Sequence, residues 1–180
     1  LPPLNISAEA NTEDTIAEIN WIAPGSALPR QFRHDDGIIT GQIGATGSPD
    51  VLIGSSYTHR ATLYEASWYL TNATSPHNEV KIIVFGLDAA GIPDINQLIY
   101  ESQLIANIDN TWNIHIFPEP LFCNNGFFVG INTPNVYTGL GLDDGVGEPY
   151  VFTPNTHFAN LDWQAGSDWL PLETVGYPNN

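Results

Sequence analysis

The sequence predicts an all-β protein, an antiparallel β-sandwich of jelly-roll type with about ten to twelve short strands. Short runs rich in Val, Ile, Phe, Tyr and Trp recur along the chain, and Gly, Pro, Asn or Asp bounds each run. This pattern is typical of antiparallel strands joined by brief connections. Because no window between these boundaries sustains a helical period over three turns, a parallel sheet with crossover helices is disfavoured.

The densest part of this pattern runs from Val80 to Asn132, and the other strands are interpreted as further members of the same sandwich. A turn-rich loop is predicted over Asp88–Ile95, and a single helical turn fits Asp94–Tyr100. In chain order, the predicted strands are Asn5–Ala10, Thr15–Ala23, Val51–Ser55, Thr58–Tyr64, Ala66–Thr71, Glu79–Leu87, Gln97–Ile105, Thr111–Phe117, Gly126–Asn132, Val136–Leu142, Pro149–Phe152 and Phe158–Trp163.

Composition excludes several classes of protein. The 180 residues fit one domain with a substantial core, and the formal net charge of −16 would repel nucleic acid. No apolar run approaches the roughly 20 residues that a membrane-spanning helix needs, and the single cysteine, Cys123, cannot form an internal disulfide. Since the chain begins with Leu1 and contains no Met, we expect a processed product or a piece of a longer protein.

The first 25 residues form a separate pattern. Ala17, Ile19, Trp21 and Ala23 alternate with mostly polar residues, which is strand periodicity. With Pro2–Ala8, this segment resembles the opening strand pair of a fibronectin type III domain of secreted bacterial proteins. We therefore expect residues 1–25 to form a strand pair that packs on the main domain, residues 26–180, or that belongs to a neighbouring domain.

A wider resemblance begins at Phe32-Arg33-His34-Asp35-Asp36-Gly37 and continues through several strand motifs, ending near Trp169. Among these are Ser67-Trp68-Tyr69-Leu70-Thr71 and Gly126-Phe127-Phe128-Val129-Gly130-Ile131. Together they resemble β-sandwich accessory modules of large secreted Bacteroidetes proteins, the cleaved-adhesin and "choice-of-anchor" jelly rolls. This resemblance implies a non-catalytic role in adhesion, carbohydrate binding or spacing between other domains.

Two Asp-Asp-Gly triplets are candidate metal sites, with Asp35, Asp36, Asp143 and Asp144 as the carboxylate ligands. Calcium takes several oxygen ligands, which loops rich in Asp and Gly can supply. Alternatively, each triplet only turns the chain, since Asp and Gly favour turns and neither triplet has the spacing of a known calcium loop. Calcium in a structural role is the cofactor that the sequence suggests.

Aromatic residues provide a candidate ligand site at Trp163 and Trp169, which lie in a polar stretch near the C-terminus. Accessible indole rings can stack on sugar rings. The alternative is core packing, which we predict for Trp21, Trp68 and Trp112 because they lie within strand patterns.

Catalytic patterns are weak. The five histidines, His34, His59, His77, His115 and His157, are scattered, and we expect His115 to be an ordinary strand residue. A carboxylate pair for glycoside hydrolysis could be drawn from Glu65, Glu101, Glu119 and Glu173, but strand spacing alone does not establish one.

The sequence therefore predicts a non-enzymatic, extracellular or cell-surface binding module of a larger protein, which recognises a glycan or a cell-surface protein. The alternative is a structural spacer or a fibre subunit assembled by edge-strand pairing. A polysaccharide-cleaving enzyme is the third hypothesis.

Overall fold

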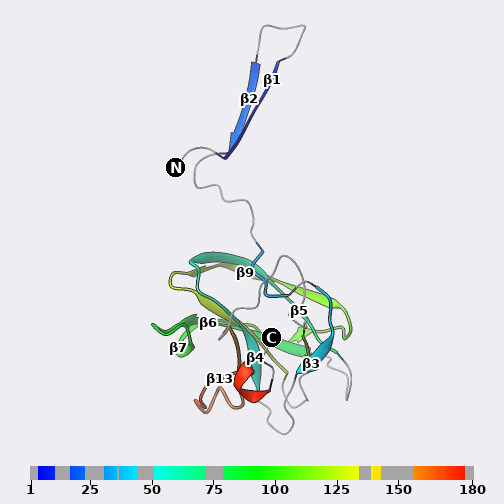
Figure 1. The fold of residues 1–180 in the computed structure, drawn as a ribbon, viewed down its shortest axis with the longest axis vertical. Coiled ribbons are helices and arrows are strands. Elements are labelled where there is room, and N and C mark those ends of the chain that lie inside the picture. Colours follow the sequence, from blue (N-terminus) through cyan, green and yellow to red (C-terminus); the bar gives the residue numbers. More distant parts are fainter. Residues whose placement is uncertain are drawn as a thin grey trace. The chain divides into compact units, whose positions relative to one another are not determined.

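A computed structural model describes residues 4–10, 17–22, 31–35, 37–43, 51–71, 79–133, 139–142 and 156–176. The chain divides into two compact units, Leu1–Phe32 and Arg33–Asn180. The first unit contains β1 (Leu4–Ala10) and β2 (Ala17–Ile22), which pair antiparallel as the predicted strand pair (Figure 1). That this pair packs on the larger unit stays a prediction.

The all-β prediction is confirmed. The described residues contain no α-helix, one short 3-10 helix η1 (Leu172–Val175), and no helix able to cross a bilayer. The strands of the second unit are β3 (Gly41–Ile43), β4 (Leu52–Tyr57), β5 (Ala61–Tyr69), β6 (Glu79–Leu87), β7 (Pro93–Glu101), β8 (Ile105–Ala106), β9 (Trp112–Cys123), β10 (Phe127–Asn132), β11 (Leu140–Leu142), β12 (His157–Asn160) and β13 (Leu170–Pro171).

The larger layer is a seven-stranded sheet in the order β13-β12-β4-β10-β6-β7, with β8 also paired to β6. All its pairings between described strands are antiparallel. This order does not establish jelly-roll connectivity, which stays a prediction.

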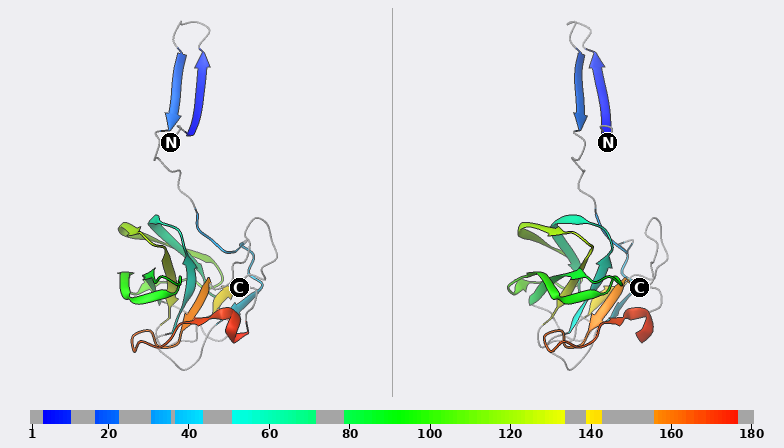
Figure 2. Two further views of the ribbon diagram at one scale, coloured as in Figure 1. Left: turned by 60° about the vertical axis from the view of Figure 1, so that its left-hand side comes forward. Right: turned by 90° about the vertical axis from the view of Figure 1, so that its left-hand side faces the viewer.

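The smaller layer consists of the β5-β9 and β3-β11 pairs. A bridge between Leu70 and Leu140 connects β5 to β11 and joins the two pairs. Side chains from both layers meet in the space between them, so the second unit has the two-layered arrangement of a β-sandwich (Figure 2).

Alternation along the central strands gives the large sheet two buried faces. Residues 53, 55 and 57 of β4 share one face with Val129 and Ile131 of β10, and this face points toward the smaller layer. On the opposite face, the segment that follows β12 brings Trp163 and Trp169 onto a cluster of buried side chains made up of Leu52, Ile83, Phe85, Leu87, Phe128 and Phe158. Strand β6 is therefore covered on both sides, which explains its almost continuous apolar run.

Two opposing glycines make the second face possible. Gly54 and Gly130 are cross-strand partners, and a Cβ on Gly54 would lie 2.0 Å from the Val129 carbonyl oxygen. A Cβ on Gly130 would lie 2.5 Å from the Phe128 ring. Since real side chains do not tolerate such distances, Gly54 is required for the close approach of the β10 backbone, and Gly130 is required to leave room for the Phe128 ring.

Several strand predictions need correction. The helical turn proposed within Asp94–Tyr100 is wrong, because this segment is part of β7 and pairs with the buried strand β6. The predicted strands Thr58–Tyr64 and Ala66–Thr71 are one strand, β5, with a register shift between Leu63 and Glu65. The predicted break at Glu65 coincides with this register shift, and pairing with β9 continues on both sides of it. The predicted strand Pro149–Phe152 lies outside the described residues.

Candidate functional site

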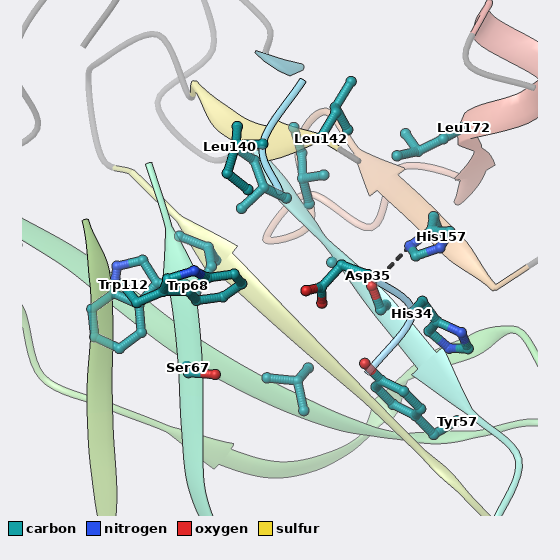
Figure 3. A pocket seen from close by; sticks show the side chains of 17 residues that line it. His34, Asp35, Tyr57, Ser67, Trp68, Trp112, Leu140, Leu142, His157 and Leu172 are labelled. Carbon is teal, nitrogen blue, oxygen red and sulfur yellow. Dashed lines mark hydrogen bonds between the residues drawn. The ribbon is translucent and has the colours of Figure 1, made fainter. Parts of the chain in front are cut away.

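A pocket of about 170 Å³ lies between the two layers of the second unit (Figure 3). Strands β4, β10 and β12 form one wall, and β5, β9 and β11 form the other. Its apolar part is lined by Ile39, Ile53, Val129, Ile131, Leu140, Leu142 and Leu172. Its polar part is lined by His34, Asp35, Ser55, Tyr57 and His157. A pocket lined by both apolar and polar side chains suits a ligand that has an apolar face and hydrogen-bonding groups.

Strand pairing brings the polar side chains together. Ser55 and His157 are cross-strand partners on β4 and β12, and Ser55 Oγ lies 2.8 Å from His157 Nδ1. The His34 ring stacks on Tyr57 at 4.5 Å between centroids and meets the His157 ring edge-on at 5.1 Å. His34 Nε2–H donates a hydrogen bond to the Ser56 carbonyl oxygen at 3.1 Å, so Nδ1 of the neutral ring is the acceptor.

Burial keeps the polar cluster of His34, Tyr57 and His157 uncharged at neutral pH. The pKa of His157 is lowered to about 3, mainly by burial and in addition by the positive charge of a protonated His34. The pKa of His34 is also lowered by burial, although the Ser56 carbonyl and the Asp35 carboxylate oppose this effect. Burial likewise raises the pKa of Tyr57. The cluster therefore offers neutral hydrogen-bonding groups rather than charges.

Asp35 supplies the carboxylate of the pocket. It precedes the short irregular segment that leads to β3, and its side chain points into the pocket toward Trp68 (Figure 3). Arg33 forms an ion pair with Asp35 Oδ1. The Asp35 side chain nevertheless retains 28% of its exposure, so its carboxylate can also accept hydrogen bonds from a ligand in the pocket.

Two tryptophans line the opposite wall. Trp68 is 3% exposed, and its Nε1–H donates to Asn107 Oδ1 at 2.8 Å, which holds the indole in place. The prediction that Trp68 is buried is therefore confirmed. The same prediction for Trp112 is wrong, since this residue is 42% exposed because it begins the edge strand β9. Its ring packs edge-on against Tyr69 at 5.8 Å and remains accessible to a ligand.

The pair of Ser55 and His157 has the separation of a nucleophile and its general base. A general base works best with a pKa near the operating pH, whereas burial holds the pKa of His157 near 3. The described pocket lining also contains a single carboxylate, Asp35, while glycoside hydrolysis uses two. That the chain is not an enzyme stays a prediction.

The predicted ligand residues Trp163 and Trp169 lie on the other face of the large sheet. Both are half-buried, and Trp169 packs edge-on against Phe128 at 4.9 Å between centroids. Neither indole N–H has a hydrogen-bond partner among the described residues. They help to close the core on this face, and a ligand-binding role for them stays a prediction.

Of the predicted metal ligands, only Asp35 lies within the described residues, and Asp36, Asp143 and Asp144 lie outside them. The described part of the chain contains no cluster of three or more His, Cys, Asp or Glu side chains that could hold a metal ion. The ion pair with Arg33 competes with any cation for the Asp35 carboxylate. Calcium stays a prediction.

No sequence pattern groups His34, Ser55, Tyr57 and His157 into one site. Ser55 and His157 are 102 positions apart, and only the β4-β12 pairing brings them together. The one available signal is alternation, because Ile53, Ser55 and Tyr57 follow the period of two that places them on one face.

The fold and this pocket define the protein as an all-β domain with a small amphipathic pocket between its layers. Comparisons with protein-family models, with curated proteins and with solved structures gave no match.

Proposed function

We propose that the chain is a non-catalytic binding module that holds a single sugar ring in the pocket between its two layers. The observation that carries the proposal is the composition of this pocket, in which indole rings face a neutral cluster of hydrogen-bonding side chains and one carboxylate. A sugar ring has apolar C–H faces that stack on aromatic side chains and hydroxyls that pair with polar ones.

Pocket size supports one ring rather than a long oligosaccharide. The volume of about 170 Å³ is below the roughly 300–1,000 Å³ typical of drug-sized ligands. A longer glycan would present one terminal residue to the pocket and leave the rest outside. The resemblance to secreted Bacteroidetes modules agrees with this proposal, and with it we expect an extracellular or cell-surface location within a larger protein.

Titration of the full chain with glucose, galactose, mannose, fucose and N-acetylglucosamine, followed by heteronuclear NMR, tests the proposal. We expect at least one sugar to bind with a Kd of about 1 mM, as is reasonable for so small a contact. Trp112→Ala and Asp35→Asn should each weaken binding about tenfold or more, because they remove a stacking surface and a charged acceptor.

Matched controls lie outside the pocket. Phe122→Ala removes an exposed ring from the same strand as Trp112, and Asp168→Asn neutralises an exposed carboxylate, so neither should change the affinity. Melting curves would confirm that all four variants fold. If no sugar binds, or if the pocket variants bind as well as the unmodified chain, the proposal is wrong, and the spacer or fibre-subunit alternative gains support.

A further inference from the structure

The outward face of the β5-β9 pair carries large apolar side chains that point away from the large sheet. Tyr64 is 62% exposed, Ile114 61%, Ile116 72% and Phe122 73%. These four residues, together with Glu65, are called the outward face below. They lie apart from the sugar pocket, since none of them lines it.

Strand register places these side chains on one surface. Ile114 and Ile116 are two positions apart on β9, and their partners on β5 are Ser67 and Glu65. Phe122 pairs with Thr62, two positions before Tyr64, so it belongs to the same face of the pair. The opposite face of β5 carries the buried residues Leu63, Ala66 and Trp68.

Single exposed apolar residues are ordinary, but a contiguous set on one sheet face is not. The large sheet shows how this chain treats an apolar face, because Trp163 and Trp169 cover the surface formed by Phe85 and Phe128. These four side chains stay exposed, and among the described residues of the second unit no segment covers them as Trp163 and Trp169 cover the large sheet. A partner would bury them.

The edge of β9 indicates how that partner binds. Among the described strands, β9 pairs with β5 alone, so no described strand occupies its other edge. Pro118 and Pro120 lack the N–H needed for pairing, which limits an added strand to the Trp112–Phe117 part of β9. This length suits an extended segment that continues the sheet by main-chain hydrogen bonds.

Charge indicates the composition of that segment. Glu65 lies on the outward face and Glu119 lies at its border, both exposed. Three basic residues are described in the second unit: Arg33 and Lys81 form ion pairs with Asp35 and Glu101, and Arg60 is exposed just before β5. A second copy of this chain would bring another formal charge of −16, whereas a basic segment would be attracted.

We propose that the outward face docks an extended segment of a partner protein in which apolar residues alternate with Lys or Arg, paired along Trp112–Phe117 of β9. The apolar side chains of the segment would cover Ile114, Ile116 and Phe122. Its basic side chains would approach Glu65 and Glu119.

Isothermal titration of the full chain with two nonapeptides tests this inference. In one peptide lysine alternates with valine, and in the other glutamate replaces every lysine. We expect the lysine peptide to bind about tenfold or more tightly than its counterpart, and Ile116→Ser or Phe122→Ser to weaken binding by a similar factor. Glu65→Lys should reduce or invert the preference between the peptides. Ile92→Ser, a change at an exposed apolar residue of a turn, is the control expected to have no effect.

Three results would overturn the inference. One is equal affinity for both peptides, or none for either. Another is sedimentation showing a dimer of the unmodified chain that Ile116→Ser converts to a monomer, since the face would then join two copies of the chain. The third is binding to phosphatidylcholine vesicles that Phe122→Ser abolishes, which would assign the face to a lipid surface. The variants in these tests, at Glu65, Ile116 and Phe122, lie outside the sugar pocket, so the two proposals are tested separately.

Discussion

The two layers of the second unit contain similar strands but treat their outer faces differently. In the large sheet, Phe85 and Phe128 are fully buried because Trp163 and Trp169 fold back over their face. In the β5-β9 pair, Ile116 and Phe122 point outward and stay exposed. Alternation of apolar residues thus determines that a strand has an apolar face. Whether that face becomes part of the core or stays exposed for a partner depends on whether another segment covers it.

The largest expected effect on stability is the difference between removing a ring from the large sheet and removing one from the β5-β9 pair. Phe85→Ala should lower the free energy of unfolding by about 3–5 kcal/mol, because it removes a fully buried ring and leaves a cavity. Phe122→Ala should change it by about 0.5 kcal/mol or less, because that ring is already exposed. Denaturant unfolding of both variants measures the difference. Similar losses of unfolding free energy in the two variants would show that the outer face of the β5-β9 pair contributes to the core.

A somewhat smaller effect is expected where the large sheet needs glycine. Gly54→Ala should destabilise the fold by about 3 kcal/mol, because the new Cβ would meet the Val129 carbonyl oxygen at 2.0 Å. Gly41→Ala in β3 is the matched control, since its nearest neighbour would be the Leu142 Cβ at 3.9 Å. That change should be neutral or stabilising by about 0.5 kcal/mol. Thermal melting of the Gly54→Ala and Gly41→Ala proteins measures both effects. A Gly54→Ala protein that melts like the unmodified chain would contradict the prediction that the large sheet needs glycine at this position.

The smallest effect concerns the buried histidines of the pocket. The pKa of His157 is lowered from 6.5 to about 3 on folding, so between these values the unfolded chain binds a proton that the folded chain does not. Stability should therefore be greatest above pH 6.5 and fall as the pH decreases, by about 1.4 kcal/mol per unit for each such proton. From pH 6.5 to 5, this amounts to about 2 kcal/mol.

Denaturant unfolding of the unmodified chain and of His157→Gln at several pH values isolates this contribution. The variant should lose much of the slope between pH 6.5 and 5, while His34 retains its own part because burial lowers its pKa as well. An identical slope in both proteins would show that His157 titrates normally and that the polar end of the pocket is open to water.

Particular residues show how far the sequence could predict the fold. Strand β6 was predicted with its exact bounds, Glu79–Leu87, because a long apolar run between turn residues has few alternatives. Strand β7 was partly mistaken for a loop and a helical turn, because its polar residues Asp94–Gln97 favour local hydrogen bonds, such as Gln97 Nε2–H to Asp94 Oδ2 at 2.7 Å. Pairing with β6 made it a strand nevertheless.

The site was less predictable than the fold. Trp163 and Trp169 stood in a polar stretch, and no local pattern indicated that they would pack against Phe85. The assignment of Asp35 as a metal ligand rested on its Asp-Asp-Gly context, whereas its position in the pocket depends on contacts with distant strands.

Sequence alone determined the class of fold, the acidic surface charge and the alternation that gives each strand its two faces. These properties depend on residue type and local spacing, which every short segment carries with it. Only the tertiary structure decided which faces meet, so it alone joined Ser55 to His157, covered Phe85 with two tryptophans and left Ile116 exposed. The reason is that antiparallel pairing joins residues that are far apart in the chain, and the spacing of residues along the chain does not encode those distances.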